Sequence, residues 1–184
     1  SGSYPEQQVV LASLGSMKSP LAVQTLSEYL SWLNSGKARA EIQLDIVEAI
    51  NQQGDDNLLS ALAEYQSGKP DDPLSPFIET LVGGSPEKGG EIFRTHEAAQ
   101  CIRCHTIFET GGTMGPGLAD VGAEHTAKEL LTALILPSDS FEEGYHMVTL
   151  SLNNGETLTG LVQDESAETI TIRSGNQQAQ EIDK

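Results

Sequence analysis

Five consecutive residues, Cys101-Ile102-Arg103-Cys104-His105, place two thiols and an imidazole close enough along the chain to bind one group together. Two thiols three positions apart on one turn of chain can reach the two vinyl groups along one edge of a porphyrin and form thioethers. The histidine that follows then faces the iron, for which imidazole is a common axial ligand. The pattern C-x-x-C-H is typical of c-type haem attachment. We therefore expect one covalently bound haem c, held by Cys101 and Cys104, with His105 as iron ligand.

A Cys-x-x-Cys pair also occurs in zinc sites and in thioredoxin-like proteins. A structural zinc site usually has four protein ligands with paired spacings, whereas this chain has two cysteines and its other histidines, at 96, 125 and 146, are not paired. A thioredoxin-like motif should follow a strand in a β-α-β unit, but residues 86–100 are polar and helical in pattern. The sequence therefore favours haem over both alternatives.

Length and charge indicate a small, soluble chain. Its 184 residues allow one or two domains with modest cores. A formal net charge of −17 would repel nucleic acid and anionic membrane surfaces, so neither is an expected partner. No apolar run approaches the roughly 20 residues that cross a bilayer, and we expect no direct membrane insertion. Because haem is attached to such motifs outside the cytoplasm, we expect a periplasmic or otherwise extracytoplasmic location and a targeting signal that preceded Ser1.

The first part of the chain has amphipathic helical patterns with clear boundary signals. Ser19-Pro20 is typical of an N-cap followed by the first helical residue. Isoleucines at 42, 46 and 50 recur every four residues until Gly54 ends the pattern. Paired helices of this kind fit a HEAT-like array or a plain helical bundle, and the sequence leaves both open. The expected elements are a helix beginning at Pro20, helices over 42–53 and 58–65, a linker over 68–76 and a brief helical turn over 76–82.

The second part has helical patterns on both sides of the haem motif and then strand patterns. Ser85-Pro86 caps one helix, and Thr126 with Glu129 forms the capping box T-x-x-E of another. After Tyr145 the apolar residues alternate, and Asn154-Gly155 is a strong signal for a β-hairpin. Further strands are expected over 169–172 and 178–182. The fold class that follows is mainly α with a small antiparallel β-sheet.

A series of short motifs occurs in a fixed order: "IQLDIVEAI", "DDPLSPFIETLVGG", "KGGEIF", "CIRCH", "GGTMGPGLADVG", "ELLTALILPS", "GYHMVTLSLNNGETLTGLV" and "ETITI". In this order, from about Ile42 to Lys184, the chain resembles the haem-binding domain at the C-terminal end of large, planctomycete-type, membrane-associated PQQ- or sugar-dehydrogenase-like proteins. In those proteins the domain follows HEAT-like helices. The resemblance implies a HEAT-like helical segment over residues 1–84. It also implies a cytochrome c-like haem-binding domain with a β-hairpin insertion over residues 85–184.

The resemblance also implies roles for individual residues. In that family, as in small class I cytochromes, the Gly-Pro after the haem motif lies on the proximal side of the haem. Pro116 is thereby the expected carbonyl acceptor for the ring N–H of His105, a bond that fixes the imidazole tautomer and raises its basicity. Phe93, with Gly89 or Gly90, matches the position where class I cytochromes cross their first and last helices.

The chain departs from the family after its last expected strand. The family's sheet is normally followed by a Met-Pro loop, which supplies the sixth iron ligand, and by a terminal helix, but the sequence stops at Asp183-Lys184. Three explanations stay open. The chain is a truncated piece, or its C-terminal segment was not included, or the protein uses a different sixth ligand.

Two side chains within the chain are candidates for that sixth ligand, Met147 and His146. Met147 begins a strand and could reach a haem edge only if the sheet folded over the distal face, and packing is the more common role of such a methionine. Met114 precedes Gly115-Pro116, so the resemblance places it on the proximal side. The other two histidines outside the motif lie in polar segments and are expected at the surface: His96 and His125.

These observations predict an electron-transfer module rather than an enzyme. The iron would accept single electrons from a dehydrogenase domain or a redox partner protein and pass them on, and the resemblance implies an upstream sugar- or alcohol-oxidising propeller domain as donor. The alternative is a haem protein with an open sixth position that binds a diatomic ligand or peroxide, as a sensor or peroxidase. A peroxidase would need a distal base, for which His146 is a candidate, and a cation near the iron. The sequence places no such pair.

Overall fold

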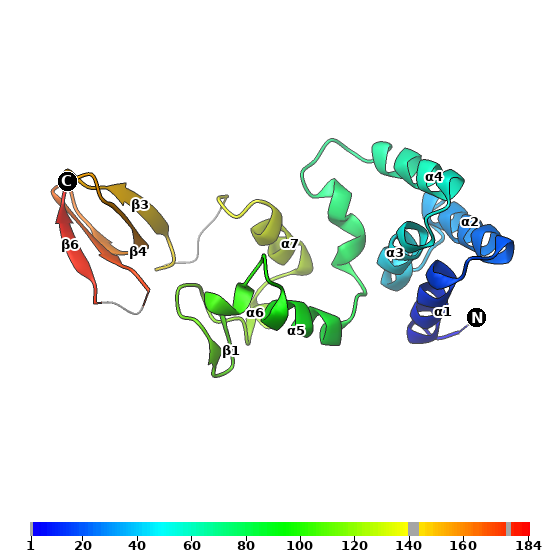
Figure 1. Ribbon diagram of the computed structural model, residues 1–184, viewed down its shortest axis with the longest axis horizontal. Helices are drawn as coiled ribbons and strands as arrows, with labels where there is room; N and C mark the ends of the chain where they lie inside the picture. Colours follow the sequence, from blue (N-terminus) through cyan, green and yellow to red (C-terminus); the bar gives the residue numbers. More distant parts are fainter. Residues whose placement is uncertain (1, 140–143, 176–177) are drawn as a thin grey trace. The chain divides into compact units, whose positions relative to one another are not determined.

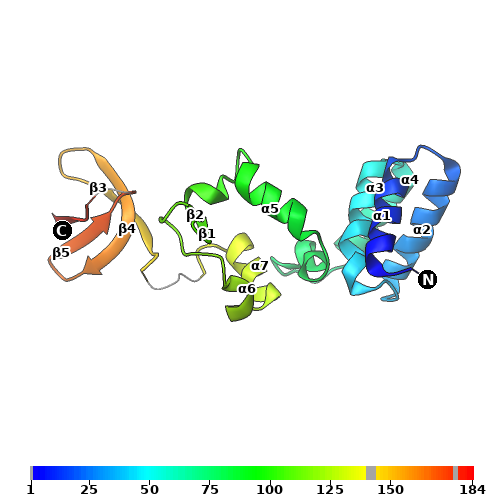
Figure 2. The same ribbon diagram turned by 90° about the horizontal axis from the view of Figure 1, so that it is seen from below.

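The computed structural model describes residues 2–139, 144–175 and 178–184. The chain divides into two compact units, Ser1–Pro86 and Glu87–Lys184, and the boundary expected between residues 84 and 85 lies just before this division. Helices and two small antiparallel sheets make up the fold, as Figures 1 and 2 show. No helix in the described ranges is long and apolar enough to cross a bilayer.

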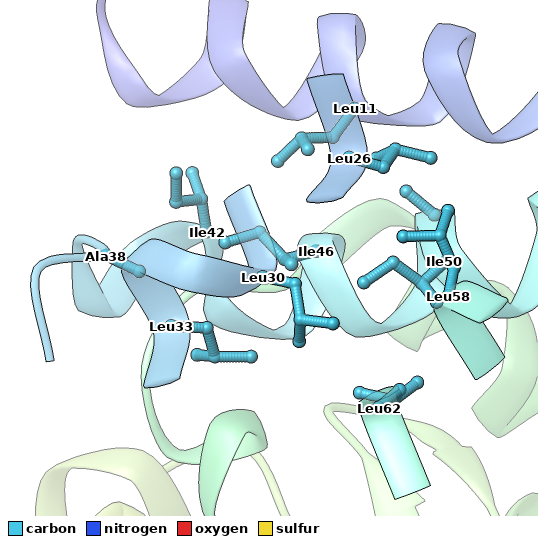
Figure 3. Close-up of a cluster of buried hydrophobic side chains, with 11 residues drawn as sticks. Leu11, Leu26, Leu30, Leu33, Ala38, Ile42, Ile46, Ile50, Leu58 and Leu62 are labelled. Atoms are coloured by element: carbon cyan, nitrogen blue, oxygen red, sulfur yellow. The ribbon is translucent and has the colours of Figure 1, made fainter. Parts of the chain in front are cut away.

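Four α-helices form the first unit: α1 (Tyr4–Ser16), α2 (Pro20–Asn34), α3 (Gln43–Gln53) and α4 (Asp56–Ser67). A 3-10 turn, η1 (Ala40–Ile42), leads into α3. Helix α3 packs against the other three helices, so its apolar side faces a shared core. Figure 3 shows this core. Its buried members are Leu11, Leu26, Leu30, Leu33, Ala38, Ile42, Ile46, Ala49, Ile50, Leu58 and Leu62.

Local signals set the ends of these helices where the sequence predicted them. The Ser19 side chain accepts a hydrogen bond from Ala22 N at 3.2 Å, and Pro20 occupies the first turn of α2. Gly54 ends α3 with φ of 72°, a left-handed conformation that favours glycine. Asp55 accepts from the first backbone N–H groups of α4. The helices expected from Pro20, over 42–53 and over 58–65 are therefore confirmed.

Helix α1 was not predicted, although the sequence contains a start signal for it. Ser3 and Glu6 form a capping box, with Ser3 N donating to Glu6 Oε2 at 2.7 Å. The apolar pattern did not support a helix because Val9 and Val10 stay exposed, whereas Leu11 is buried. Close packing on α3 places the helix: a Cβ at Gly15 would lie 3.0 Å from the backbone of Ala49.

The segment after α4 is held to the first unit by a buried polar cluster. It forms a 3-10 helix, η2 (Ser75–Leu81), where the sequence predicted a brief helical turn. The Tyr65 hydroxyl and Lys69 Nζ donate to the two oxygens of the buried Glu79 carboxylate, at 2.5 and 2.7 Å. Burial, and then the Glu79 carboxylate, raise the pKa of the Tyr65 hydroxyl well above its usual range. Glu79 thus links η2 to α4 with both oxygens satisfied.

The second unit begins with short elements around the Cys101–His105 motif. They are α5 (Pro86–Thr95), η3 (Cys101–Arg103), β1 (Thr106–Ile107), β2 (Thr110–Gly111), α6 (Val121–Glu124) and α7 (Ala127–Ile135). The Thr126 capping box is present at the start of α7, as predicted. Among the described residues of 87–146, Leu131 is the only buried apolar side chain. This part of the chain therefore has almost no apolar core of its own.

A four-stranded antiparallel sheet completes the second unit. Its strands β3 (Met147–Ser151), β4 (Thr157–Glu165), β5 (Thr169–Arg173) and β6 (Gln180–Asp183) pair in sequence order. Asn154-Gly155 lies in the turn between β3 and β4, with φ of 86° at Gly155. The predicted hairpin and the further strands are confirmed. Leu161, Ile170 and Ile172 are the buried apolar residues of the sheet.

We expect the Glu79→Gln variant to lower the free energy of unfolding of the first unit by about 3 kcal/mol, because it leaves the ammonium group of Lys69 nearly buried beside a neutral side chain. Urea unfolding followed by the fluorescence of Trp32, the chain's one tryptophan, reports on this unit. The matched control is Glu64→Gln, which neutralises an exposed carboxylate on α4 and should leave stability unchanged. Equal unfolding midpoints for both variants would contradict the role of Glu79.

Candidate functional site

The reactive side chains lie on a single tight turn. Cys104 N and His105 N both donate to the carbonyl oxygen of Cys101, at 3.1 and 3.0 Å. Gln100 enters the turn with φ of 48°, and the chain leaves it into β1. Only the three residues of η3 are helical. The turn still brings Cys101, Cys104 and His105 together.

A downstream loop, residues 112–118, runs beside the motif and is bonded to its backbone. Gly112 N donates to the carbonyl of Ile102 at 2.9 Å, and Gly115 N donates to that of Cys104 at 2.7 Å. Leu118 N donates to the carbonyl of Thr106 at 2.8 Å. These three hydrogen bonds add to those within the turn and fix the loop beside the motif. We call residues 112–118 the proximal loop.

Glycines allow this close approach. A Cβ at Gly112 would lie 1.9 Å from the carbonyl oxygen of Arg103, and one at Gly111 would lie 2.1 Å from that of His105. Both atoms belong to backbone, so neither can move away cheaply. Gly111 also has φ of 127°, which side chains rarely adopt. Only glycine fits at these two positions.

The imidazole of His105 has a defined orientation. Its Nδ1 lies 2.9 Å from the carbonyl oxygen of Pro116, the acceptor that the sequence resemblance implied. Because a carbonyl oxygen only accepts, Nδ1 carries a proton, and in the neutral ring Nε2 keeps the lone pair. Gly115 lies against the ring, since a Cβ there would be 2.5 Å from Cε1. The half-buried ring is thus fixed in direction and in tautomer.

Both thiols are free, with Cys101 half-buried and Cys104 exposed. The turn therefore presents two sulfur atoms that can form covalent bonds and one imidazole nitrogen that can bind a metal. Across the described ranges, no three or more His, Cys, Asp or Glu side chains are grouped to hold a metal ion by themselves. The residues that could hold a cofactor are Cys101, Cys104 and His105, with Pro116 orienting the ring.

Three large apolar side chains of the second unit are open to solvent. Phe108, at the tip of the β1–β2 hairpin, is 82% exposed, Leu134 on α7 is 77% exposed and Ile92 on α5 is 54% exposed. Phe93 of α5 is half-buried.

The other candidate residues lie on the surface or at its edge. Met147 is 44% exposed and shares the outward face of β3 with Thr149 and Ser151, and His146 before it is also exposed. Met114 is half-buried within the proximal loop. The two histidines expected at the surface are exposed, His96 accepting from Ala99 N at 3.1 Å and His125 ending α6.

Sequence reasoning missed two features of the site. Gly111 and Gly112 were recognised only as part of a motif, although a Gly-Gly pair after the histidine was a signal for close backbone contact. Arg173 donates through Nη2 to the carbonyl of Thr113 at 3.4 Å and so joins β5 to the proximal loop. These residues are 60 positions apart in the chain, and no local pattern predicts such a contact.

Substituting Gly112 should disturb the motif directly. In Gly112→Ala the new Cβ overlaps the backbone of Arg103, and we expect a loss of at least about 2 kcal/mol in the stability of the second unit, measured by thermal unfolding. The Nδ1–H resonance of His105 should also shift as the proximal loop moves. The control is Gly122→Ala, where a Cβ meets nothing within 4 Å, and its stability should equal that of the unaltered chain or exceed it. Similar losses in both variants would refute the role of the close approach.

The start of α7 should depend on pH through Glu129. Hydrogen bonds from the backbone and side chain of Thr126 lower the pKa of the Glu129 carboxyl below 4.5. The pKa of Glu129 is lower in the folded state than in the unfolded state. The stabilisation of the helix start by the ionised carboxylate is therefore complete above the unfolded-state pKa, and it is lost as pH falls through the folded-state pKa. Backbone chemical shifts of Ala127 to Leu130 should show the first turn loosening on acidification. This pH-dependent change in chemical shift should vanish in Glu129→Gln, whereas the Glu124→Gln variant on α6 should retain it.

Comparison with known proteins adds no assignment, since no family model matches the chain and no curated protein matches its sequence. The chemistry and geometry of the chain's own residues therefore carry the functional argument.

Proposed function

We propose that this chain is a monohaem c-type cytochrome domain that transfers single electrons. The observation that carries the proposal is the oriented imidazole of His105, which directly follows two free thiols on one turn of chain. Covalent attachment of a c-type haem needs this combination of residues. An electron carrier also gains from a ligand whose direction is set in advance, because little then rearranges when the charge on the iron changes.

The residues of the site fit a covalently bound haem. Cys101 and Cys104 would each add a sulfur atom to a vinyl group, and His105 would bind the iron through Nε2, the nitrogen that keeps its lone pair. The Pro116 carbonyl, as acceptor from Nδ1, would hold the ring in that tautomer and increase its basicity. When bound, the haem supplies an iron that cycles between the ferrous and ferric states. Cys101, Cys104, His105 and Pro116 are the proposed cofactor residues.

The missing apolar core of this region supports the same cofactor. Phe108, Leu134 and Ile92 are more than half exposed, and only Leu131 is buried among the described residues of 87–146. Solvent-exposed apolar surface costs about 25 cal/mol per Å², and a porphyrin is a large, flat, apolar partner that would cover such side chains. The proposed fold is accordingly a cytochrome c-like domain whose core is completed by its cofactor, after a HEAT-like helical segment.

The setting of this electron carrier follows from its chemistry and charge. Attachment of haem c outside the cytoplasm implies a periplasmic or otherwise extracytoplasmic location. The donor would be a dehydrogenase domain or a redox partner protein, as the sequence resemblance implies. With a net charge of −17, the chain would attract a basic partner and repel nucleic acid.

The test is to produce the whole chain with a secretion signal in a host that attaches c-type haem, and then to measure intact mass and optical spectra. The mass should rise by that of one haem. The dithionite-reduced protein should give a low-spin spectrum that carbon monoxide does not change. Loss of the added mass in the double variant Cys101→Ser/Cys104→Ser would place the attachment, and His105→Ala should abolish the low-spin spectrum while His125→Ala should retain it.

Each other outcome has a defined meaning. A haem-loaded protein with a high-spin spectrum that shifts with carbon monoxide would have an open sixth position in this chain, and would favour the ligand-binding alternative over electron transfer. Correctly processed protein without any haem band would overturn both functions.

A further inference from the structure

A hollow on the surface of the first unit combines features of a ligand site. It lies between α1, α2 and the connection from α2 to α3 and has a volume of about 430 Å³. Pockets for small molecules usually have volumes of about 300 to 1,000 Å³, so its size is adequate. Its walls are formed by Gly2, Glu6, Gln7, Val10, Tyr29, Trp32, Lys37, Ala38, Arg39 and Ile42.

One wall of the hollow is aromatic. Tyr29 and Trp32, one turn apart on α2, meet edge to face with ring centroids 4.8 Å apart. Trp32 is 43% exposed, and Val10, which also lines the hollow, is 48% exposed. The pair holds the indole in place while leaving part of it uncovered. The hollow thus offers a firm apolar surface to a ligand.

Cations are concentrated at the same hollow. The first unit contains Lys18, Lys37, Arg39 and Lys69 as its basic residues. Lys18 is bonded to the backbone carbonyl of Gln53, and Lys69 is paired with Glu79, so both have structural roles. The remaining two, Lys37 and Arg39, both line the hollow. In a chain with a net charge of −17, this placement is distinctive.

The backbone brings the segment that carries the two cations close to the end of α2. Gly36, with φ of 67°, turns the chain back after α2, and Lys37 N then donates to the carbonyl of Trp32 at 2.8 Å. Arg39 has one acidic contact, with Glu41 at 3.5 Å, between side chains that are 47% and 37% exposed. An exposed pair of this kind contributes little, and the guanidinium has donors left for a ligand.

The acidic residue of the hollow is already engaged. Glu6 accepts from Ser3 N at 2.7 Å and from the Ser3 hydroxyl at 3.0 Å. The hydrogen bond from the backbone of Ser3 lowers the pKa of Glu6, so its carboxylate stays ionised as part of the α1 cap. The hollow thus presents the ammonium group of Lys37 and the guanidinium group of Arg39 as donors, and their two positive charges exceed the single negative charge of Glu6.

We propose that this hollow binds a small organic carboxylate. The carboxylate pairs with Lys37 and Arg39, and the apolar body of the ligand lies against Trp32 and Val10. Charge-assisted hydrogen bonds to an ammonium and a guanidinium give the site its preference for an anion. No residue of the haem motif takes part, so this site stands or falls separately from the proposed electron transfer.

The test uses the whole chain with sodium benzoate as the probe and benzyl alcohol as its neutral counterpart. Trp32 is the only tryptophan, so the chain has a single indole N–H resonance, and its shift reports on this hollow alone. Benzoate should shift that resonance saturably, with a dissociation constant of about 1 mM or lower, as expected for a ligand of this size. Benzyl alcohol should bind at least about tenfold more weakly, because it lacks the charge that the two cations recognise.

Variants then test the contribution of the two cations to binding. The double variant Lys37→Gln/Arg39→Gln should weaken benzoate binding at least about tenfold, whereas Lys18→Gln, which removes a cation outside the hollow, should leave it unchanged. Lys37 and Arg39 are exposed, and thermal unfolding checks that the double variant keeps its fold. No saturable shift at benzoate concentrations about tenfold above that constant would overturn the proposal. Equal binding of benzyl alcohol, or no effect of the double variant, would also overturn it.

Discussion

The hydrogen bond from His105 Nδ1 to the Pro116 carbonyl is the constraint on which the second unit's site depends. It exists because the proximal loop runs beside the motif, and the loop can do so because Gly112 has no side chain to strike the Arg103 carbonyl. Gly115 then leaves room for the ring itself. The absence of side chains at these two glycines thus lets the loop orient the imidazole, and with it the Nε2 lone pair that a bound metal would need.

The two units are stabilised in different ways. Leucine and isoleucine side chains from four helices fill the core of the first unit, and its one buried carboxylate, Glu79, is satisfied by Tyr65 and Lys69. Around the motif of the second unit, backbone hydrogen bonds and glycine contacts set the geometry, while apolar side chains such as Phe108 stay uncovered. The proposed haem would supply what that region lacks, an apolar centre around which these side chains pack.

Much of the secondary structure could be predicted because the signals are local. Ser19-Pro20, Gly54 and the Thr126 box act on backbone groups within a few residues, and Asn154-Gly155 adopts its turn largely unaided. Helix α1 was missed because its apolar residues follow no clear period, and its burial comes from contact with α3. The proposed carboxylate site was also missed, because its cations and its aromatic wall come from separate elements that meet only in the folded unit.

The sequence by itself determined which groups are present and how they are spaced, because the separation of Cys101, Cys104 and His105 along the chain is covalent. The position of Pro116 relative to His105 was inferred from a resemblance, and the structure supplies the contact. Only the tertiary structure decided the direction of the imidazole, the burial of Glu79 and the hollow that α1 forms with Trp32 and Lys37. These features depend on which distant surfaces pack together, and that choice is made by the summed burial and hydrogen bonding of the whole unit rather than by neighbours in sequence.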